Sequence, residues 1–391
     1  MGYEINLGNG EWATGQGGMA MTVTDTDTGV KEALLIGCDR NSNKTAVNKD
    51  GLLYDVLPYE PSVAYIDGVG VLNNEPQATN LFLFSEDFTG SGWSNQRGTI
   101  AKDSSNPSIQ AGKNSTKWQL TSETGVKYLR VGASRTGEHT FSIYVKKGNY
   151  RYIGLLNTNS AKTVLDFDTG NIVIGSSYSE VESLSGGWFR ISLKYTWSGS
   201  FNYSGIYFTD ETGVDLTIST GNEYFYIDAA QMQTGDKADS YIVTNGATST
   251  RLADTGFQTP DISKWINKDE FNIDVVIKFK SISNNQEITL GSSSGNRLRI
   301  QLRPSGQLFV FFYANGTQVI QLSSNINLNE EYNIRVKSKS GDSKLYINDN
   351  LQDSSSVSFV YSEHLKHLLL SDISGSVSDI EAIVKQIEIK S

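Results

Sequence analysis

The sequence has a single cysteine, Cys38, so it cannot form a disulfide framework within the chain and has no cysteine pair spaced for a zinc finger. Its three histidines are His139, His364 and His367. The last two have HxxH spacing, but without a neighbouring cysteine or carboxylate pair this spacing favours a polar surface loop over a zinc site. Packing or assembly, rather than disulfides or metal, should therefore stabilise the fold.

Long hydrophobic runs are also missing. No stretch of about 18 apolar residues occurs, and the amino terminus lacks the basic and apolar regions of a signal peptide. We therefore expect a soluble protein made in the cytosol. Glycine-rich loops leading into a helix and nucleophile-elbow motifs are missing as well, so nucleotide binding and acyl transfer gain no support.

Positive charge is scarce. The chain carries 43 acidic and 33 basic residues, a net charge of −10, and shows no long Lys/Arg cluster. Because a phosphate backbone would be repelled by this charge, nucleic acid and anionic membrane surfaces are poor candidates for partners.

Glycine and aromatic residues, in contrast, are plentiful: 37 Gly, 19 Tyr and 16 Phe among 391 residues. Glycine supplies the positive φ of tight turns and aromatic rings suit pleated sheets, so this composition indicates a turn-rich β protein. Residues 81 to about 250 alternate apolar and polar positions, as in the inward series Phe141, Ile143 and Val145. Such strands, joined by hairpin turns, require a second sheet and predict a jelly-roll β-sandwich.

The carboxy-terminal third repeats this pattern in a distinct sequence. In the segment RLRIQLR, the alternation predicts Leu298, Ile300 and Leu302 inward and the arginines outward, at positions Arg297, Arg299 and Arg303. The predicted fold class is therefore all-β: a small amino-terminal β or irregular segment followed by two antiparallel sandwiches, with a boundary near residues 250 to 265.

Some sandwiches of this kind hydrolyse glycosidic bonds with a pair of carboxylates on one strand. The nearest match here is NIDVVI, in which Asn272 and Ile277 stand where both carboxylates would be needed. Asp274 alone cannot perform a two-carboxylate displacement, so we expect binding rather than catalysis and predict no catalytic residue.

Residues 72–93, LNNEPQATNLFLFSEDFTGSGW, resemble a junction sequence of phage tail and tail-fibre proteins. The flanks at 47–70, 186–193 and 226–254 extend the resemblance to roughly residues 45 to 254, although Gln233 replaces a usual glutamate. The matching residues of the junction itself are Leu72, Glu75, Pro76, Gln77, Thr79, Asn80, Leu81, Ser85, Glu86, Phe88 and Trp93.

The segment 330–353 resembles strands of laminin-G and concanavalin-like sandwiches. Together the two resemblances imply three parts: a virion-anchoring segment at 1–80, a carbohydrate-binding-module-like jelly roll at 81–254, and a laminin-G or concanavalin-like sandwich at 255–391.

The resemblance implies a virion protein of a tail fibre, baseplate or head fibre. It would contact other virion proteins through residues 1–80 and bacterial surface polysaccharide through its sandwiches, as a homotrimer. Two alternatives remain: a purely structural virion protein whose sandwiches make only protein contacts, and an accessory module of a secreted polysaccharide-degrading enzyme.

Aromatic residues of segment 196–208 are the predicted sugar contacts, because rings stack on the apolar face of a sugar while nearby polar groups bond its hydroxyls. The candidates are Trp197, Tyr203 and Tyr207. The alternative is that Trp197 and Tyr207 belong to the sandwich core.

Jelly-roll sugar-binding modules often hold one structural calcium ion between the first and last strands, and the resemblance implies oxygen ligands at Glu86, Asp87 and Asp228. Thr89 stands where such modules usually have a glutamate.

Overall fold

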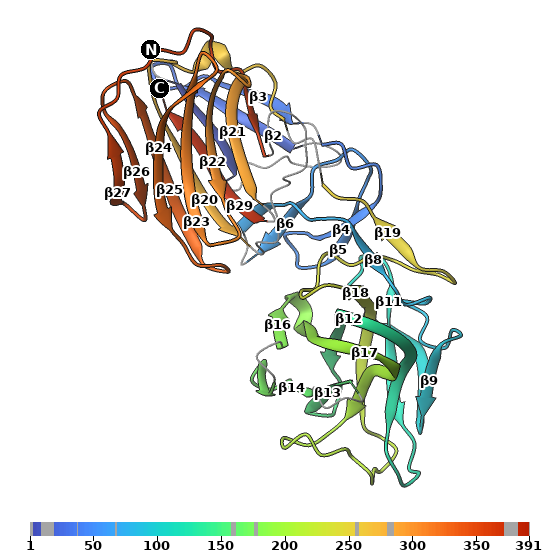
Figure 1. Cartoon of the computed structure of the whole chain (residues 1–391). Coiled ribbons are helices and arrows are strands. Elements are labelled where there is room, and N and C mark those ends of the chain that lie inside the picture. Colours follow the sequence, from blue (N-terminus) through green and yellow to red (C-terminus); the bar gives the residue numbers. More distant parts are fainter. Residues whose placement is uncertain are drawn as a thin grey trace. The chain divides into compact units, whose positions relative to one another are not determined.

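The structure is a computed structural model of the chain and describes residues 3–8, 19–36, 38–66, 69–157, 162–175, 179–254, 258–279, 285–370 and 382–390. Strands dominate these residues, with short 3-10 turns at Ser185–Gly187 and Ser263–Trp265 (Figure 1). The predicted all-β class with antiparallel sheets is confirmed. No helix within the described ranges is long and apolar enough to cross a membrane.

The chain divides into two compact units. The middle unit comprises Asp50–Tyr54 and Ala78–Arg251, and the terminal unit comprises Met1–Lys49, Asp55–Gln77 and Leu252–Ser391. The two units meet along the sequence at Arg251 and Leu252. The division into the parts 1–80, 81–254 and 255–391 stays a prediction from the sequence.

The middle unit contains an antiparallel sheet of ten strands that folds around its own core, and a two-stranded sheet of β8 (Ala78–Asn80) and β19 (Ser249–Arg251). The main strand order is β10-β11-β18-β12-β17-β13-β14-β15, with β9 beside β12 and β16 beside β17. The bounds are β9 Trp93–Gln96, β10 Gly98–Pro107, β11 Asn114–Leu120, β12 Tyr128–Lys147, β13 Tyr152–Asn157, β14 Lys162–Asp166, β15 Asn171–Ile174, β16 Ser179–Ser183, β17 Trp188–Phe208 and β18 Tyr224–Thr234.

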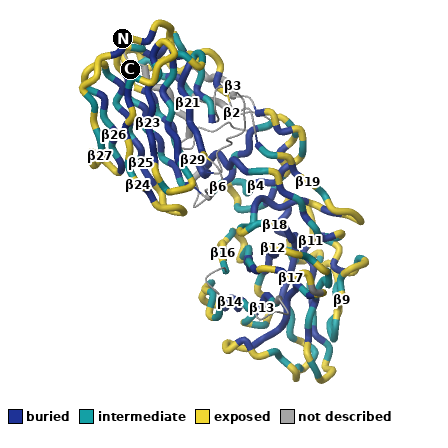
Figure 2. Tube along the Cα trace, in the orientation of Figure 1, coloured by how far each residue is buried: buried dark blue, intermediate teal, exposed yellow. Residues whose placement is uncertain are grey.

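Two long strands, β12 and β17, form the spine of this unit. Their register shifts between Ser134 and Thr136, which is a bulge that lets the strands bend and serve both ends of the sheet. The predicted inward series Phe141, Ile143 and Val145 is fully buried. In Figure 2 dark, buried segments alternate with lighter ones along β12 and β17.

The junction residues of the sequence resemblance have structural roles in this unit. Asn80, at the end of β8 (Ala78–Asn80), donates to the carbonyls of Ala230 and Ile242, while its oxygen accepts from two backbone amides. The Ser85 hydroxyl accepts from the Tyr241 hydroxyl, at 2.6 Å, and from a backbone amide. Buried polar side chains whose hydrogen bonds are all satisfied hold the surrounding backbone in one conformation. This structural role accounts for Asn80 and Ser85 within the junction sequence.

The terminal unit is a two-layer sandwich around a second core. One layer has the order β27-β26-β25-β20-β29-β1-β2-β3, with β6 and β7 attached, and the other has the order β24-β23-β22-β21-β28. The bounds of the second layer are β21 Gln286–Ser293, β22 Asn296–Leu302, β23 Gln307–Ala314, β24 Thr317–Asn325 and β28 His367–Leu369. In the first layer they are β1 Tyr3–Gly8, β2 Met19–Asp25, β3 Lys31–Ile36, β6 Val63–Ile66, β7 Val69–Asn73, β20 Glu270–Phe279, β25 Glu331–Lys339, β26 Ser343–Ile347, β27 Asn350–Ser355 and β29 Ala382–Lys390.

Strands from the predicted anchoring segment 1–80 belong to this sandwich. The first strand, β1, pairs with the last strand, β29, and β7 also pairs with β29. These residues therefore form part of the sandwich rather than a segment separate from it. The edge of β29 needs a hydrogen-bonding neighbour, and β1 at the beginning of the chain supplies it. Attachment to a virion through these residues stays a prediction.

A buried cluster of charges ties distant segments of the terminal unit together. The carboxylate of Asp254 contacts the Arg40 guanidinium at 2.5 Å and the Lys44 ammonium at 2.6 Å, and Lys44 also lies 3.0 Å from Glu75. All four side chains are almost completely inaccessible. Glu75 belongs to the junction 72–93 and Asp254 to the flank 226–254 of the sequence resemblance, so these residues too have a structural role.

Candidate functional site

Two of the three predicted sugar-contacting residues are buried. Trp197 is 3% exposed and packs against Tyr195, with ring centroids 5.5 Å apart. Tyr207 is 1% exposed and lies over Gly154, where a Cβ would be only 2.1 Å from the ring. Burial also raises the pKa of Tyr207. The alternative placement of both residues in the packed interior is therefore correct, and neither ring offers a free face.

The third predicted residue, Tyr203, is only partly buried and belongs to a cluster that we name the Arg130 stack: Tyr128, Arg130, Phe201 and Tyr203. The guanidinium of Arg130 lies between two rings, 3.7 Å from the centroid of Tyr128 and 3.6 Å from that of Tyr203. Phe201 meets Tyr203 edge to face, with centroids 5.3 Å apart. Segment 196–208 thus contributes two of the four members.

The register of β12 and β17 builds this stack. Leu129 and Ile206 are in the core, so the alternate positions Arg130 and Tyr203 face away from it. Gly132 is directly opposite Tyr203, and a Cβ at Gly132 would be 2.5 Å from the Phe201 ring. Glycine is therefore required for Phe201 to lie across the strand in this position.

The stack presents both a ring and a fixed hydrogen-bond donor. Phe201 is 60% exposed, so its ring stays largely open to solvent while one side of it contacts Tyr203. The Arg130 Nη2 atom donates to the Tyr128 hydroxyl at 2.9 Å, and its Nε atom is buried without a hydrogen-bond partner within the described part of the chain. Stacking on two rings orients the guanidinium while leaving it charged.

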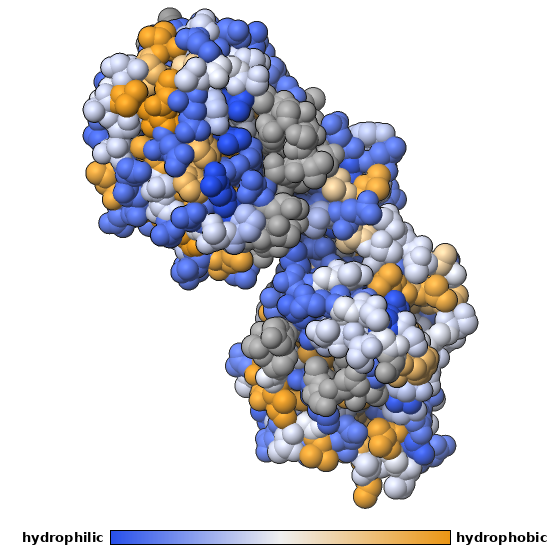
Figure 3. Space-filling model, viewed as in Figure 1, coloured by the Kyte–Doolittle hydropathy of each residue, from blue (hydrophilic) through white to orange (hydrophobic). Residues whose placement is uncertain are grey.

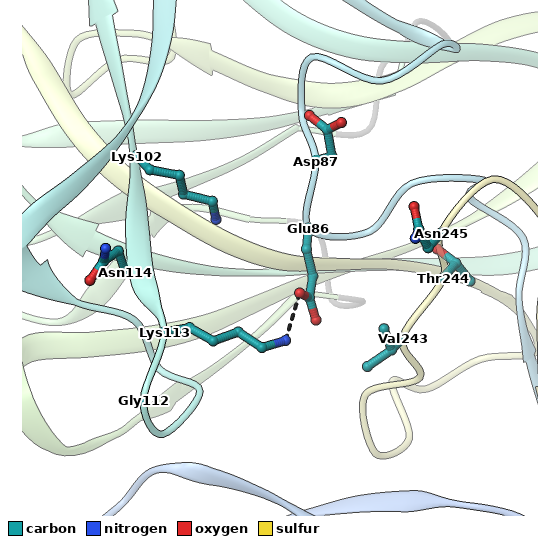
Figure 4. A pocket seen from close by; sticks show the side chains of 9 residues that line it. All are labelled: Glu86, Asp87, Lys102, Gly112, Lys113, Asn114, Val243, Thr244 and Asn245. Carbon is teal, nitrogen blue, oxygen red and sulfur yellow. Dashed lines mark hydrogen bonds and ion pairs between the residues drawn. The ribbon is translucent and has the colours of Figure 1, made fainter.

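The predicted calcium ligands Glu86 and Asp87 line an open hollow of about 590 Å³ in the middle unit. Figure 4 shows Glu86 directed toward Lys113 and Asp87 directed away from both. The Lys113 ammonium lies 2.7 Å from the Glu86 carboxylate and 2.7 Å from the Gln110 side-chain oxygen. A lysine already supplies positive charge at this position.

The other two acidic groups are engaged elsewhere. The Asp87 carboxylate accepts from the amide and the hydroxyl of Thr89, and these bonds lower its pKa. Asp228 is buried, accepts from Ser108 and from the backbone amide of Ala229, and has a raised pKa because of its burial.

Metal binding at these three carboxylates finds little support in their arrangement. Across the residues that the structure describes, no group of three or more His, Cys, Asp or Glu side chains is placed to hold a metal ion. The side chains do not fit a three-carboxylate calcium site, and calcium binding stays a prediction from the resemblance.

Sequence reasoning missed Tyr128 and Arg130 and left Phe201 out of the proposed contacts. These residues are separated by about 70 positions, and only the register of β12 with β17 brings them together. The sequence signal for this cluster is the alternation of Tyr128, Arg130 and Gly132. It places two large polar side chains, and a glycine without a side chain, on one face of a strand.

Comparisons with known proteins assign no family to the chain. No family model matches it, and no curated protein matches it significantly. Among solved structures, the galectin LEC-6 of Caenorhabditis elegans is 12% identical, covering 34% of this chain and 88% of its own, with a TM-score of 0.26. The carbohydrate binding module CBM66 from Bacillus subtilis is 14% identical, covering 36% and 85%, with a TM-score of 0.27.

A Trypanosoma rangeli sialidase, solved in complex with sialic acid, matches over 95% of this chain and 63% of its own at 9% identity and a TM-score of 0.29. At such identities and TM-scores these similarities assign no function. The function must therefore be argued from the residues of this chain.

Proposed function

We propose that this protein is a glycan-binding component of a bacteriophage virion, without catalytic activity of its own, and that the Arg130 stack contacts the sugar. The observation that carries the glycan-binding proposal is the exposed Phe201 ring beside a guanidinium held between Tyr128 and Tyr203. The resemblance of residues 72–93 to phage tail and tail-fibre proteins supports the virion role.

The chemistry of the Arg130 stack suits a sugar ring. An exposed aromatic face attracts the C–H face of a pyranose, and a guanidinium beside it can donate to ring hydroxyls. Because Arg130 is already oriented by two rings, little side-chain entropy is lost when a ligand binds. A protein contact could also use Phe201, which leaves the purely structural virion protein as the alternative.

A virion setting would compensate for a weak single site. One exposed ring and one arginine give a modest affinity, but several copies on one particle bind a repetitive polysaccharide with avidity. A homotrimer, as the resemblance implies, would supply three such sites. Attachment to the rest of the particle is proposed for the amino-terminal part, whose strands lie in the terminal unit.

The test is retention of the purified full chain on a panel of immobilised bacterial capsular polysaccharides and lipopolysaccharides. We expect Phe201→Ala to weaken binding about fivefold per site, because one stacking ring contributes on the order of 1 kcal/mol. Arg130→Lys should also weaken binding, since a lysine keeps the charge but cannot stack as a planar group.

The matched control is Val173→Ala on the edge strand β15, another large apolar side chain with a substantially exposed surface. It should bind like the wild type. If the wild type binds no glycan of the panel, or if Phe201→Ala folds and binds normally, the sugar role of the stack is refuted. Association of the non-binding protein with purified virions would then favour the structural alternative.

A further inference from the structure

The five-stranded sheet of the terminal unit has an outward face on which arginines and aromatic rings alternate. Its core side is made by residues such as Leu298, Ile300 and Val310, so the intervening positions lie on the opposite side. Strongly hydrophilic atoms lie over β22, with hydrophobic atoms beside them, in Figure 3. We name this set of side chains the arginine face: Glu287, Thr289, Arg297, Arg299, Gln301, Arg303, Phe309, Phe311 and Tyr313.

Each arginine of this face lies over a ring of β23. The guanidinium carbons are 4.1 Å from the Tyr313 centroid for Arg297, 4.7 Å from Phe311 for Arg299 and 4.1 Å from Phe309 for Arg303. Phe309 and Phe311 are themselves stacked, with centroids 5.6 Å apart. The rings of Phe309 and Phe311 are 8% and 3% exposed, whereas the three arginines are partly exposed, Arg299 with 17% of its side chain accessible.

A chain of polar contacts continues the row on the other flank of β22. Arg303 donates to the Gln301 oxygen at 3.1 Å, the Gln301 amide donates to Glu287, and Arg299 lies 3.6 Å from Glu287. These contacts fix Arg299 and Arg303 at one spacing along the strand. Successive positions on one face of a strand are about 7 Å apart, so the row extends over roughly 20 Å.

Several buried polar atoms of this face have no hydrogen-bond partner within the described residues. They are Oε2 of Glu287, Oγ1 of Thr289, and Nε of Arg297 and of Arg299. Glu287 is 4% exposed and Thr289 is inaccessible. Leaving a buried polar atom without a partner is unfavourable. The two Nε atoms can donate only to an acceptor such as water or an anionic oxygen, whereas the Glu287 oxygen can accept only from a donor.

We infer that the arginine face binds an anionic polysaccharide, one whose acidic groups recur along the chain. Three arginines against one glutamate give this face a net positive charge in a protein whose net charge is −10. Oriented guanidinium groups bind carboxylates through paired N–H donors, and a row of them matches a repeating acidic sugar better than a single ion.

Nucleic acid fits this face less well. Duplex DNA carries one charge about every 1.7 Å along its axis, and the acidic remainder of the chain would repel so dense a polyanion. Single strands bind through open rings on which bases stack, whereas Phe309 and Phe311 are covered.

The experiment uses the full chain and polygalacturonate as the probe, with neutral dextran and single-stranded DNA of equal charge as comparisons. We expect polygalacturonate to bind with an affinity that falls as salt rises, and dextran not to bind. The double substitution Arg297→Gln with Arg303→Gln should weaken polygalacturonate binding about tenfold or more. Arg299→Lys, which retains charge, should weaken it less but measurably.

The matched control is Lys337→Gln with Lys344→Gln, which removes the same charge from the other sheet of the same sandwich. It should change binding less than twofold. Failure of the wild type to bind polygalacturonate, equal loss in the control, or tighter binding of DNA would each overturn the inference. Because Phe201→Ala should leave polygalacturonate binding intact, failure here is distinguishable from failure of the proposed role of the Arg130 stack.

Discussion

The two units use the same pair of side-chain types in opposite ways. In the Arg130 stack one arginine is held between two tyrosine rings, and a third ring, Phe201, is left 60% exposed. On the arginine face three guanidinium groups cover the rings, and Phe311 is only 3% exposed. The first surface presents an aromatic ring to solvent and the second presents charge, so their ligands should differ in charge.

Strand register explains this difference. In β22 and β23 Arg299 stands directly opposite Phe311, so each long side chain can lie on the ring across from it. In β12 and β17 the residue opposite Tyr203 is Gly132, which leaves space that the Phe201 ring occupies. A glycine at one position in a ladder thus decides whether a ring is covered or displayed.

The largest expected effect tests whether the Arg130 stack of the middle unit and the arginine face of the terminal unit depend on each other for their stability. Asp254→Ala leaves Arg40 and Lys44 buried without their shared carboxylate, which should destabilise the terminal unit by about 3–5 kcal/mol. Hydrogen exchange followed by mass spectrometry should show faster exchange in peptides of β20 to β29, whereas peptides of β12 and β17 should keep their protection.

The control for this substitution is Asp342→Ala, whose carboxylate forms ion pairs with Lys337 and Lys344 at the surface. Exposed pairs contribute little, so the exchange pattern should stay that of the wild type. Equal loss of protection in both units after Asp254→Ala would mean that the two surfaces do not rest on separate frameworks.

The next effect distinguishes a covered ring from a displayed one. Phe311→Ala removes a buried ring and its contact with Arg299, and should cost roughly 2–3 kcal/mol of folding free energy. Phe201→Ala removes a ring that solvent already reaches, and should change stability by less than about 0.5 kcal/mol. Urea unfolding of both variants measures the difference, and similar losses would contradict the contrast between the surfaces.

Alternation along single strands was enough to predict much of the fold. It placed Phe141 and Ile143 inside, and it placed Arg297 and Arg299 on the outward side of their strand. It could not predict that β1 would pair with β29, because that contact joins the two ends of the chain. Pairing between strands distant in sequence depends on tertiary packing rather than on local pattern.

The candidate site was harder to predict for the same reason. Within segment 196–208 the rings of Trp197 and Phe201 look alike in sequence, yet one is buried and the other exposed. A bulge in β17, between Ser198 and Phe201, separates their surroundings, and Gly199 with its positive φ of 90° is its only mark in the local sequence. The arginine face was visible as outward arginines, but the rings beneath them come from the next strand.

A smaller effect concerns the pH dependence of the middle unit. Burial lowers the pKa of His139 below its ordinary value of 6.5, and the nearby charge of Arg135 acts in the same direction, while the Gly137 carbonyl opposes them. The unfolded chain therefore takes up a proton at a higher pH than the folded chain. Stability contributed by neutral His139 is complete above about pH 7 and declines as the pH falls toward the lowered folded value.

The measurement is urea unfolding at pH 7.5 and pH 5.5 for the wild type and for His139→Gln, a neutral side chain that does not titrate. The wild type should lose more stability between these pH values than the variant does. An identical loss in both proteins would show that other groups, chiefly carboxylates, account for the pH dependence.

The smallest expected effect comes from substituting Gly132, the residue that leaves space for the exposed Phe201 ring in the Arg130 stack. Gly132→Ala places a methyl group 2.5 Å from the present position of the Phe201 ring, so the ring must move away from Tyr203. Because Phe201 is exposed, this movement should cost less than about 1 kcal/mol of stability, but it removes the fixed arrangement of ring and guanidinium. Glycan binding should fall about threefold. The control is Ser134→Ala. Ser134 is on β12, like Gly132, and stands opposite Phe201 of β17, so this change alters a neighbouring side chain without crowding the ring. Suppose that Gly132→Ala binds glycan as tightly as the wild type and unfolds at the same temperature. The position of the Phe201 ring then does not affect recognition, and the exposure of Phe201 does not determine what the middle unit binds.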